Sequence, residues 1–385
     1  MNRLSPRDVT FMRQALDIAA MGRGLVEPNP MVGAVIVRDN KVVGAGYHQR
    51  YGDDHAEINA INDCKKNGVD PAGLTMFVTL EPCCHSGKTG PCTKAILAAK
   101  LMRVVIAMQD PFEKVSGKGI EQLKQAGIDV TVGVCEAQAL DLNEAFIKRV
   151  TTGLPWMIGK WAQTVDGKTA TTSGDSKWIS CYESREVVHK VRARVDAIMV
   201  GVRTVELDDP ALDARHVHTK RAAKRIVIDP SLRIPMKSKL VHDDGPPVYL
   251  ITSEKAMEQE SERVKDLEQH GLNLLPVPMK QNSRLDMHAT LRHLVDLHLV
   301  TNVLVEGGAS LMGSLFADEL LDQLLVFIAP RIAGDQEALS AVHGHNLLHI
   351  CDTHHLSLRD VTQISDDILL DYRVIHPNST NIVNS

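Results

Sequence analysis

The sequence is poor in cysteine and aromatic residues and has no long apolar run. Seven cysteines in 385 residues are too few, and odd in number, for a disulfide framework. No apolar stretch approaches the ~18 residues of a membrane span, and the N-terminus carries charges in place of an apolar signal core. The formal net charge of −5 argues against a non-specific nucleic-acid binder, which is usually basic. We therefore expect a cytoplasmic protein with reduced thiols that binds neither membranes nor nucleic acids.

The composition is otherwise that of a globular protein, with 44% hydrophobic and 24% charged residues. The length allows two or three domains of ~150 residues each. A pattern of strands and helices ends near residue 148 and restarts after Pro155. We therefore predict domains at 1–148 and 154–376 and a frayed tail at 377–385.

Strands and helices alternate in the first part of the chain. Such alternation is typical of a three-layer α/β sandwich, in which ligands bind beyond the carboxyl ends of the strands. Ser5 is a candidate N-cap for a first helix that begins at Pro6. The periodicity predicts strands at 32–37, 41–46, 74–80, 104–108 and 130–134, and further helices at 55–67, 93–99, 119–126 and 136–148.

Two motifs in this part indicate a zinc site. His55 and Glu57 lie two residues apart, and Cys83 and Cys92 each follow a proline. One imidazole nitrogen and two thiolates suit a tetrahedral zinc ion whose fourth position is left for water. Glu57 is placed to move protons without binding the metal, and a helix start at Cys92 favours a thiolate there. The H-x-E and P-C elements are those of the zinc deaminases.

The choice of ligands leaves an alternative open. A structural zinc site would close with a fourth protein ligand, and Cys84 or His85 could supply it. We favour Cys92 because it heads a helix, and because the adjacent side chains of Cys83 and Cys84 diverge. Cys84 is then expected to be a small buried apolar residue.

The second part has a Gly-Gly turn between a strand and a helix, at Glu306-Gly307-Gly308. Such glycines let backbone N–H groups approach a phosphate at a helix start, although the same pair also makes an ordinary turn and is not the G-x-G-x-x-G pattern. Five histidines between 343 and 355 lack suitable metal-binding partners, and we expect them on the surface. The predicted strands are 156–162, 197–200, 225–228, 248–252, 302–305, 323–328 and 371–375, with helices at 183–193, 255–269 and after Gly308 to about 321.

The first part resembles the deaminase half of the bifunctional riboflavin-biosynthesis deaminase/reductases. The resemblance rests on segments 29–37, 44–48, 55–57 and 79–92, and on the eight residues between Cys83 and Cys92, where the general deaminase form has two. It implies a cytidine-deaminase-like fold, zinc bound by His55, Cys83 and Cys92, and catalysis by Glu57. It also implies that Asn29 and His48 lie near the pyrimidine substrate, although a surface histidine at the end of a hairpin is the alternative for His48.

Segments 160–168, 174–179, 200–205, 208–212 and 305–308 resemble the reductase half of the same family. That half has a dihydrofolate-reductase-like fold and uses NADPH. The positions that match its NADPH contacts are Ala162, Trp178, Thr204, Asp208, Ser253, Gly308, Ala309, Ser310, Leu311, Met312, Gly313 and Ser314. Those that match its substrate contacts are Ser176, Arg192, Leu212, Arg215 and Glu306.

Arginine suits the ribose phosphate of that family's substrate, although either arginine is alternatively a solvated surface charge. Asp208 or a water molecule is the candidate proton source. The resemblance also implies a homodimer, formed through the reductase domains.

We therefore expect a bifunctional enzyme that acts on a phosphorylated pyrimidine. Its first domain would deaminate 2,5-diamino-6-(5-phosphoribosylamino)pyrimidin-4-one at zinc, and its second would reduce the ribosyl group to ribityl phosphate with NADPH. One rival is another zinc deaminase, acting on a nucleoside or RNA, with an accessory domain. The other is a structural-zinc protein joined to a binding module. The long gap between Cys83 and Cys92 and the acidic net charge count against the first rival.

Overall fold

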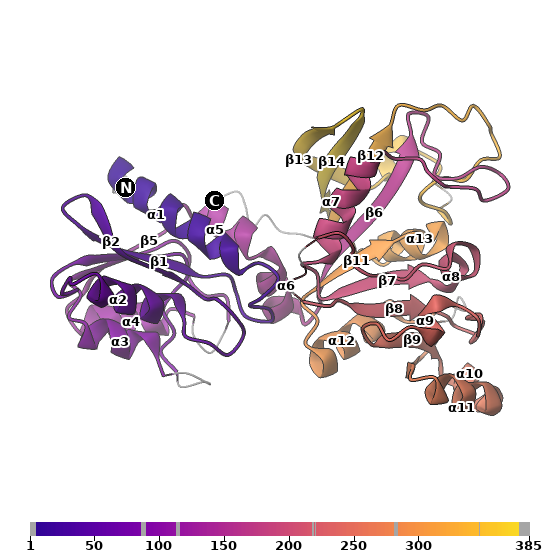
Figure 1. Cartoon of the computed structure of the whole chain (residues 1–385). Coiled ribbons are helices and arrows are strands. Elements are labelled where there is room, and N and C mark those ends of the chain that lie inside the picture. Colours follow the sequence, from indigo (N-terminus) through magenta and orange to yellow (C-terminus); the bar gives the residue numbers. More distant parts are fainter. Residues whose placement is uncertain are drawn as a thin grey trace. The chain divides into compact units, whose positions relative to one another are not determined.

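The chain divides into two compact units, one up to Gly153 and the other from Leu154. The computed structural model describes residues 5–85, 90–112, 116–217, 219, 221–280, 284–345 and 347–376, so the predicted tail at 377–385 lies outside the described residues. Each unit has its own sheet (Figure 1). Within the described ranges, no helix is long and apolar enough to cross a membrane.

The first unit is built on a five-stranded sheet. Its elements are α1 Pro6–Ala19, η1 Ala20–Gly22, β1 Gly33–Arg38, β2 Lys41–Tyr47, α2 Ala56–Lys66, β3 Thr75–Val78, α3 Cys92–Ala98, β4 Arg103–Ile106, α4 Lys118–Gln125, β5 Asp129–Val132, α5 Glu136–Leu142 and α6 Glu144–Thr152. The strand order is β2-β1-β3-β4-β5, with β3, β4 and β5 parallel. One core packs α2, α3 and α4 on one face, and a second packs α1 and α5 on the other. The predicted three-layer sandwich is confirmed.

The predicted single helix at 136–148 is wrong, because Asn143 interrupts it. Asn143 has a φ of −110° and separates α5 from α6. Its side-chain Oδ1 accepts a hydrogen bond from the Met31 N–H at 2.8 Å, and its Nδ2 donates to the Met31 carbonyl at 3.0 Å. The tertiary hydrogen bonds of a buried amide therefore outweigh the helical periodicity. Ser5 occupies the N-cap position of α1 but makes no side-chain capping bond.

Two glycines let α2 lie directly on the edge strand β2. A Cβ on Gly46 would lie 2.4 Å from the Ala60 nitrogen, and one on Gly44 would lie 2.6 Å from the Ala60 carbonyl oxygen. At this separation, three side chains spaced four residues apart form hydrogen bonds with the outer backbone groups of β2. Two of them lie on α2 and the third is its C-cap. Asn59 Nδ2 donates to the Tyr47 carbonyl, Asp63 accepts from the Ala45 N–H, and Asn67 Nδ2 donates to the Val43 carbonyl. This polar ladder satisfies an otherwise open sheet edge.

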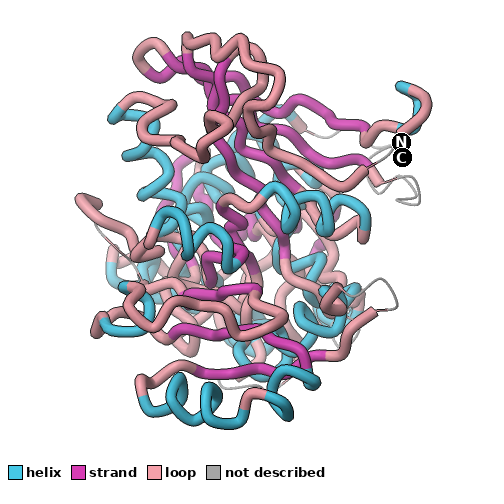
Figure 2. Tube along the Cα trace, turned by 90° about the vertical axis from the view of Figure 1, so that its right-hand side faces the viewer, coloured by secondary structure: helices cyan, strands magenta, loops and turns pink. Residues whose placement is uncertain are grey.

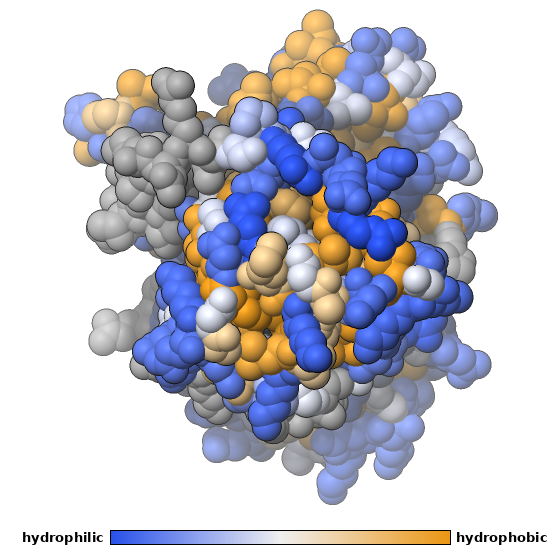
Figure 3. All heavy atoms as spheres, turned by 90° about the vertical axis from the view of Figure 1, so that its left-hand side faces the viewer, coloured by the Kyte–Doolittle hydropathy of each residue, from blue (hydrophilic) through white to orange (hydrophobic). Residues whose placement is uncertain are grey.

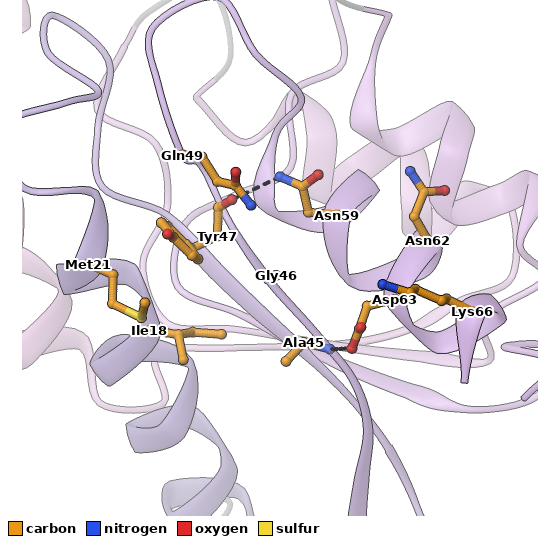
Figure 4. A pocket seen from close by; sticks show the side chains of 10 residues that line it. All are labelled: Ile18, Met21, Ala45, Gly46, Tyr47, Gln49, Asn59, Asn62, Asp63 and Lys66. Atoms are coloured by element: carbon orange, nitrogen blue, oxygen red, sulfur yellow. Dashed lines mark hydrogen bonds between the residues drawn. The ribbon is translucent and has the colours of Figure 1, made fainter. Parts of the chain in front are cut away.

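Figure 4 shows two of these bonds on the wall of a shallow pocket of about 390 Å³. The pocket lies between the end of α1, strand β2 and helix α2. Figure 3, in which the first unit faces the viewer, shows apolar side chains gathered in the middle of the face with hydrophilic ones around them. Met21, which is 54% exposed, lines the shallow pocket.

The second unit is built on a nine-stranded sheet. Its elements are β6 Trp156–Thr164, α7 Tyr182–Arg192, β7 Ala197–Gly201, α8 Val202–Asp208, β8 Lys224–Ile228, α9 Lys239–His242, β9 Val248–Ser253, α10 Glu254–Gln259, α11 Ser261–Gln269, β10 Asn273–Val277, α12 Met287–His298, β11 Asn302–Glu306, α13 Ala309–Ala317, β12 Gln323–Ala329, η2 Ile350–Asp352, β13 His355–Ile364 and β14 Asp367–Ile375. The strand order is β10-β9-β8-β7-β11-β6-β12-β14-β13. The predicted helix at 255–269 is two helices, because Glu260 breaks it at a φ of −112°.

This order places β7, β11 and β6 side by side and parallel at the centre of the sheet. The carboxyl ends of β7 and β11 therefore meet at one edge, where Gly201 and Glu306 lie, and Lys160 of β6 pairs with Glu306. The first seven strands in this order, β10-β9-β8-β7-β11-β6-β12, are all parallel. Strands β14 and β13 add an antiparallel pair at the far side. Figures 1 and 2 show the strands following one another with a continuous twist.

Candidate active sites

The predicted zinc ligands converge in the first unit. His55 Nδ1 lies 3.6 Å from Cys83 Sγ and 3.3 Å from Cys92 Sγ, and the three ligand atoms all lie within 4.8 Å of one another. A tetrahedral zinc ion with ordinary Zn–S and Zn–N lengths holds N and S about 3.5 Å apart, so the three side chains fit that metal. Within the described residues, Cys84 and His85 are not part of this cluster.

The three ligands come from the ends of different elements. His55 is the N-cap of α2, Cys92 begins α3, and Cys83 follows β3. The backbone N–H of Cys92 donates to Cys83 Sγ at 3.4 Å. The hydrogen bond from the Cys92 side chain holds the pKa of Cys83 below its ordinary value. The start of α3 therefore also favours the thiolate of Cys83.

Glu81 fixes the backbone next to Cys83. Its buried carboxylate accepts hydrogen bonds from four backbone N–H groups, which belong to Asp110, Gly117, Gly119 and Ile120. A Cβ on Gly119 would lie only 2.1 Å from the Pro82 carbonyl oxygen. Glu81 therefore holds the start of α4 against the Pro82-Cys83 turn.

Glu57 lies in the first turn of α2, beside the ligand cluster. It is 3% exposed and lies within hydrogen-bonding range of Cys92. Burial raises the pKa of Glu57 to about 7, although the charge of His55 opposes this. A carboxyl group whose pKa lies near neutrality can both take up and release a proton.

A pocket of about 340 Å³ opens beside His55, Glu57 and Cys83. Asn29 and His48 line it, and His48 is only 2% exposed, which excludes the surface alternative for His48. His48 Nε2 lies 3.1 Å from Asn29 Nδ2, and His48 Nδ1 lies 3.1 Å from the Asp54 carbonyl. Because a carbonyl only accepts, Nδ1 carries the proton and Nε2 accepts from Asn29. Burial lowers the pKa of His48, which favours this neutral form.

The sequence analysis missed several residues that line this pocket. Asp110 lies in the loop after β4, and burial raises its pKa to about 6. Phe146, Arg149 and Val150 come from α6. Their i, i+3, i+4 spacing places them on one helix face, but that signal indicates a site only when the position of the helix is known.

In the second unit, the sequence-predicted Glu306 and Arg192 form a buried ion pair. Arg192 Nε and Nη2 donate to the two oxygens of Glu306 at 2.6 and 2.7 Å, and Lys160 Nζ lies 3.8 Å from Glu306. Burial alone would raise the pKa of Glu306, but Arg192 and then Lys160 outweigh it and hold that pKa at about 2. Lys160 is a charged residue of this site that the sequence analysis did not single out.

The Gly307-Gly308 turn lies between β11 and α13 and faces α8. Both glycines have positive φ values, of 76° and 87°, and Gly308 is the N-cap of α13 without a side-chain cap. Thr204 Oγ1 lies 3.3 Å from the Cβ position of Gly307 and 3.7 Å from that of Gly308. A narrow, side-chain-free helix start with a hydroxyl beside it fits a phosphate-bearing cofactor.

The other predicted NADPH positions divide into two groups. Asp208 lies one turn after Thr204 on α8, and its Oδ1 is 3.8 Å from Lys177 Nζ. Lys177 precedes Trp178 in the chain, and Trp178 is exposed. Ser253 ends β9, three strands from β11, and its hydroxyl caps α10 and bonds to the Pro230 carbonyl.

In the remaining positions, packing decides what a ligand could reach. Ala162 lies on β6 opposite Phe327 and is partly exposed, whereas Leu311, Met312 and Gly313 lie on the buried face of α13. Ala309, Ser310 and Ser314 retain exposed surface.

Arg215 is linked to the ion pair through Asp213. Its guanidinium lies 3.1 Å from the Asp213 carboxylate, and Arg192 Nη1 donates to the Asp213 carbonyl. Leu212, which precedes Asp213 in the chain, is buried and has a φ of 50°. Ser176 is half-buried and lies two residues before Trp178. The structure thus brings Arg192, Arg215 and Glu306 together.

The fold and the two sites define a class of protein, a zinc deaminase joined to a reductase. Residues 5–108 match the cytidine and deoxycytidylate deaminase zinc-binding region, and residues 155–370 match the RibD C-terminal domain. Riboflavin biosynthesis protein RibD of Aquifex aeolicus is 41% identical over 328 residues, which are 85% of this chain and 88% of the relative. The chain belongs to the RibD family, the bifunctional deaminase/reductases of riboflavin biosynthesis.

Solved structures agree with this assignment. Acinetobacter baumannii RibD in its form 1 is 32% identical, with a TM-score of 0.84 over 96% of this chain and 99% of that one. A diaminohydroxyphosphoribosylaminopyrimidine deaminase/5-amino-6-(5-phosphoribosylamino)uracil reductase from Thermotoga maritima is 33% identical, with a TM-score of 0.83 over the same shares. The family and fold expected from the sequence are confirmed.

Proposed function

We propose that the first unit deaminates 2,5-diamino-6-(5-phosphoribosylamino)pyrimidin-4-one and that the second reduces the ribosyl group of the product with NADPH. The observation that carries the proposal is the convergence of His55, Cys83 and Cys92 beside buried Glu57, at the wall of a pocket. The name of the Thermotoga maritima relative supports the choice of substrate.

In the first site, His55, Cys83 and Cys92 would hold a zinc ion, which would supply a water of lowered pKa as the nucleophile. Glu57 would pass one proton of that water to the ring nitrogen as the water oxygen bonds to the ring carbon, and would then pass the second proton, from the new hydroxyl, to the amine. The C–N bond breaks, so that ammonia departs and a carbonyl remains. Asn29 and neutral His48 orient the pyrimidine from the pocket wall beside His55. Glu81 keeps the Cys83 turn in place throughout.

In the second site, bound NADPH would supply a hydride to the sugar C1, and the ring oxygen would take up a proton as the C1–O bond breaks and the ribose opens. The cofactor is held by Thr204, Asp208, Trp178, Ala162 and the start of α13, Gly308 to Ser314. Ser253 is the remaining predicted contact, and its hydroxyl is already bonded to the Pro230 carbonyl and the start of α10. Ser176, Leu212, Arg215, Arg192 and Glu306 hold the substrate.

Because Glu306 neutralises Arg192 in a buried pair, the pair presents hydrogen bonds to the sugar. Arg215 is the better phosphate ligand, since its side chain is 58% exposed and its pair with Asp213 is open to solvent. Asp208 remains a candidate proton source, and buried Lys160 is a second one.

The full-length protein tests both halves in one assay. Zinc-loaded protein is incubated with the pyrimidine substrate, and ammonia release and NADPH oxidation are followed separately. Absence of ammonia refutes the first half of the proposal, and absence of NADPH oxidation with the deaminated product refutes the second. The zinc content of Cys92→Ser and Cys84→Ser tests the ligands, since only the former should lose the metal.

We also propose that the chain forms a homodimer through the β13–β14 hairpin. Leu356, Leu358 and Val361 of β13 pair with Val374, Tyr372 and Leu370 of β14, so they lie on one face of the hairpin. The register shift between Leu358 and Asp360 keeps Val361 on that face. The β14 side chains pack on the core, whereas the three β13 side chains are 41–54% exposed at the sheet edge. An apolar face that continues beyond the core suits a second copy of the same hairpin.

A further inference from the structure

The wall of the first unit's pocket contains an arginine that has no side-chain partner among the described residues. Arg149 lines the pocket, and its Nε is buried with no hydrogen-bond partner. Among the described residues, no side-chain hydrogen bond or ion pair involves its guanidinium. Buried polar groups are nearly always paired, so an unpaired guanidinium in a site pocket indicates a missing anion.

Three of the four carboxylates that line the same pocket are already engaged, and the fourth, Asp53, is exposed and forms no ion pair with Arg149 among the described residues. Glu81 accepts four backbone N–H bonds, and Asp110 accepts the Phe112 N–H at 2.8 Å. Glu57 belongs to the zinc cluster. Arg149 is the only lysine or arginine among the described residues that line the pocket. Its charge is therefore available to a ligand.

The local structure explains why Arg149 points there. Asn143 ends α5, and its amide bonds to both backbone groups of Met31, between pocket-lining Pro30 and Val32. This anchors the start of α6 to the pocket loop. One turn later, the face that carries Phe146, Arg149 and Val150 lines the pocket. Phe146 and Val150 add apolar surface to the same pocket, which strengthens the attraction of Arg149 for an anion.

The second unit offers an informative contrast. Arg192, which sequence resemblance suggested as a substrate contact, is paired with Glu306 at 2.6 Å. An arginine already paired with a carboxylate offers little charge to a phosphate. Arg149 has no such partner, and the planar guanidinium is suited to bind phosphate oxygens in pairs.

We propose that Arg149 binds the phosphate of the deaminase substrate and makes the first site selective for phosphorylated pyrimidines. This inference rests on the proposed deaminase function and adds the residue that recognises the anionic end of the substrate. The pyrimidine then lies at Glu57 and the phosphate at α6. A dephosphorylated substrate would leave Arg149 unpaired, so Arg149 would add nothing to the binding affinity of that substrate.

The test compares two substrates, the phosphorylated pyrimidine and its dephosphorylated form, in zinc-loaded full-length protein. Arg149→Leu should raise the KM for the phosphorylated substrate about 10- to 100-fold and leave the dephosphorylated one unchanged. Arg149→Lys should recover part of the loss. Lys148→Gln removes the same charge from the same helix outside the pocket lining, and should change neither KM by more than about twofold.

The outcomes separate this inference from the proposed function. If the unaltered protein releases no ammonia from either substrate, the proposed deaminase function fails. If it does, and Arg149→Leu affects both substrates equally or leaves the phosphorylated KM unchanged, only the role of Arg149 is overturned. Turnover of the dephosphorylated substrate and reductase activity show that the variant is folded.

Discussion

Glu57 and Glu306 are both buried glutamates, yet their surroundings move their pKa values in opposite directions. Burial dominates at Glu57 and raises its pKa to about 7, whereas Arg192 and Lys160 hold that of Glu306 at about 2. The first can exchange protons near neutral pH, and the second stays charged. This difference suits Glu57 to proton transfer and Glu306 to a fixed charge in the reductase site.

Glu57→Gln should abolish ammonia release while zinc remains bound. The amide keeps the size of the side chain but cannot accept the proton of the attacking water, so a loss of roughly 10²–10⁴-fold is expected. Zinc content and ammonia release are measured on the same preparation. Reductase activity with the deaminated product is the control and should be unchanged. Undiminished deamination would contradict the role given to Glu57.

Glu306→Gln should destabilise the second unit by about 3–5 kcal/mol at neutral pH, since Arg192 and Lys160 lose their buried partner. The folded pKa of Glu306 is depressed to about 2. Its stabilising contribution is therefore present above the unfolded value of about 4.3 and is lost as pH falls toward 2. Thermal unfolding of both proteins should show a gap in Tm at pH 7 that narrows below about pH 4.5. A gap that is the same at pH 7 and pH 3 would contradict this account.

At the residue scale, short motifs predicted well which side chains converge. His55, Glu57, Cys83 and Cys92 could be identified because their chemistry is specific and they sit at the ends of elements. Arg149 could not be identified, because a single basic residue in a helical turn resembles an ordinary solvated charge. Its exceptional feature, the missing partner, exists only in three dimensions.

At the element scale, the sequence predicted regular elements better than their interruptions. Most strands of both sheets were found from their apolar runs, but the breaks at Asn143 and Glu260 were missed, because helical periodicity continues across both. Strands β10 and β13 were also missed. Strand β10 is short and contains Pro276, and nearly all residues of β13 are exposed, so that it lacks the usual burial pattern. Helix α12 was left unassigned despite its apolar spacing. The missed break at Asn143 matters most, because it sets the position of α6.

Gly46→Ala should displace α2 and so disturb His55 and Glu57 at its start. The new Cβ would lie 2.4 Å from the Ala60 backbone nitrogen, which cannot move without the helix. We expect a loss of about 1–3 kcal/mol, seen as a lower Tm, together with loss of deamination.

Gly90→Ala is the matched control, since its Cβ would have no neighbour within 4 Å among the described residues and Gly90 is not one of the described glycines with a positive φ. It should change stability by no more than about 0.5 kcal/mol. Reductase activity should survive in both variants. Equal melting temperatures for the two variants would show that α2 does not depend on contact at Gly46.

At the scale of the whole molecule, two units with separate cores carry two consecutive reactions. The order of the motifs in the sequence was enough to predict this arrangement. Subunit association was harder to derive, because an exposed apolar residue on its own is ordinary. The register of β13 against β14 adds the missing information, since it places Leu356, Leu358 and Val361 on one face.

Leu358→Asp should convert the proposed dimer into a monomer. Leu358 is 54% exposed and lies in the middle of the apolar row, so a charge there opposes association with little effect on the core. Light scattering after size exclusion should report the mass of two chains for the unaltered protein and of one chain for the variant. Leu297→Asp is the control, because Leu297 is 66% exposed on α12 of the same unit but outside the hairpin. If both variants keep the mass of two chains, the hairpin is not the interface, and if the unaltered protein has the mass of one chain, the homodimer proposal fails.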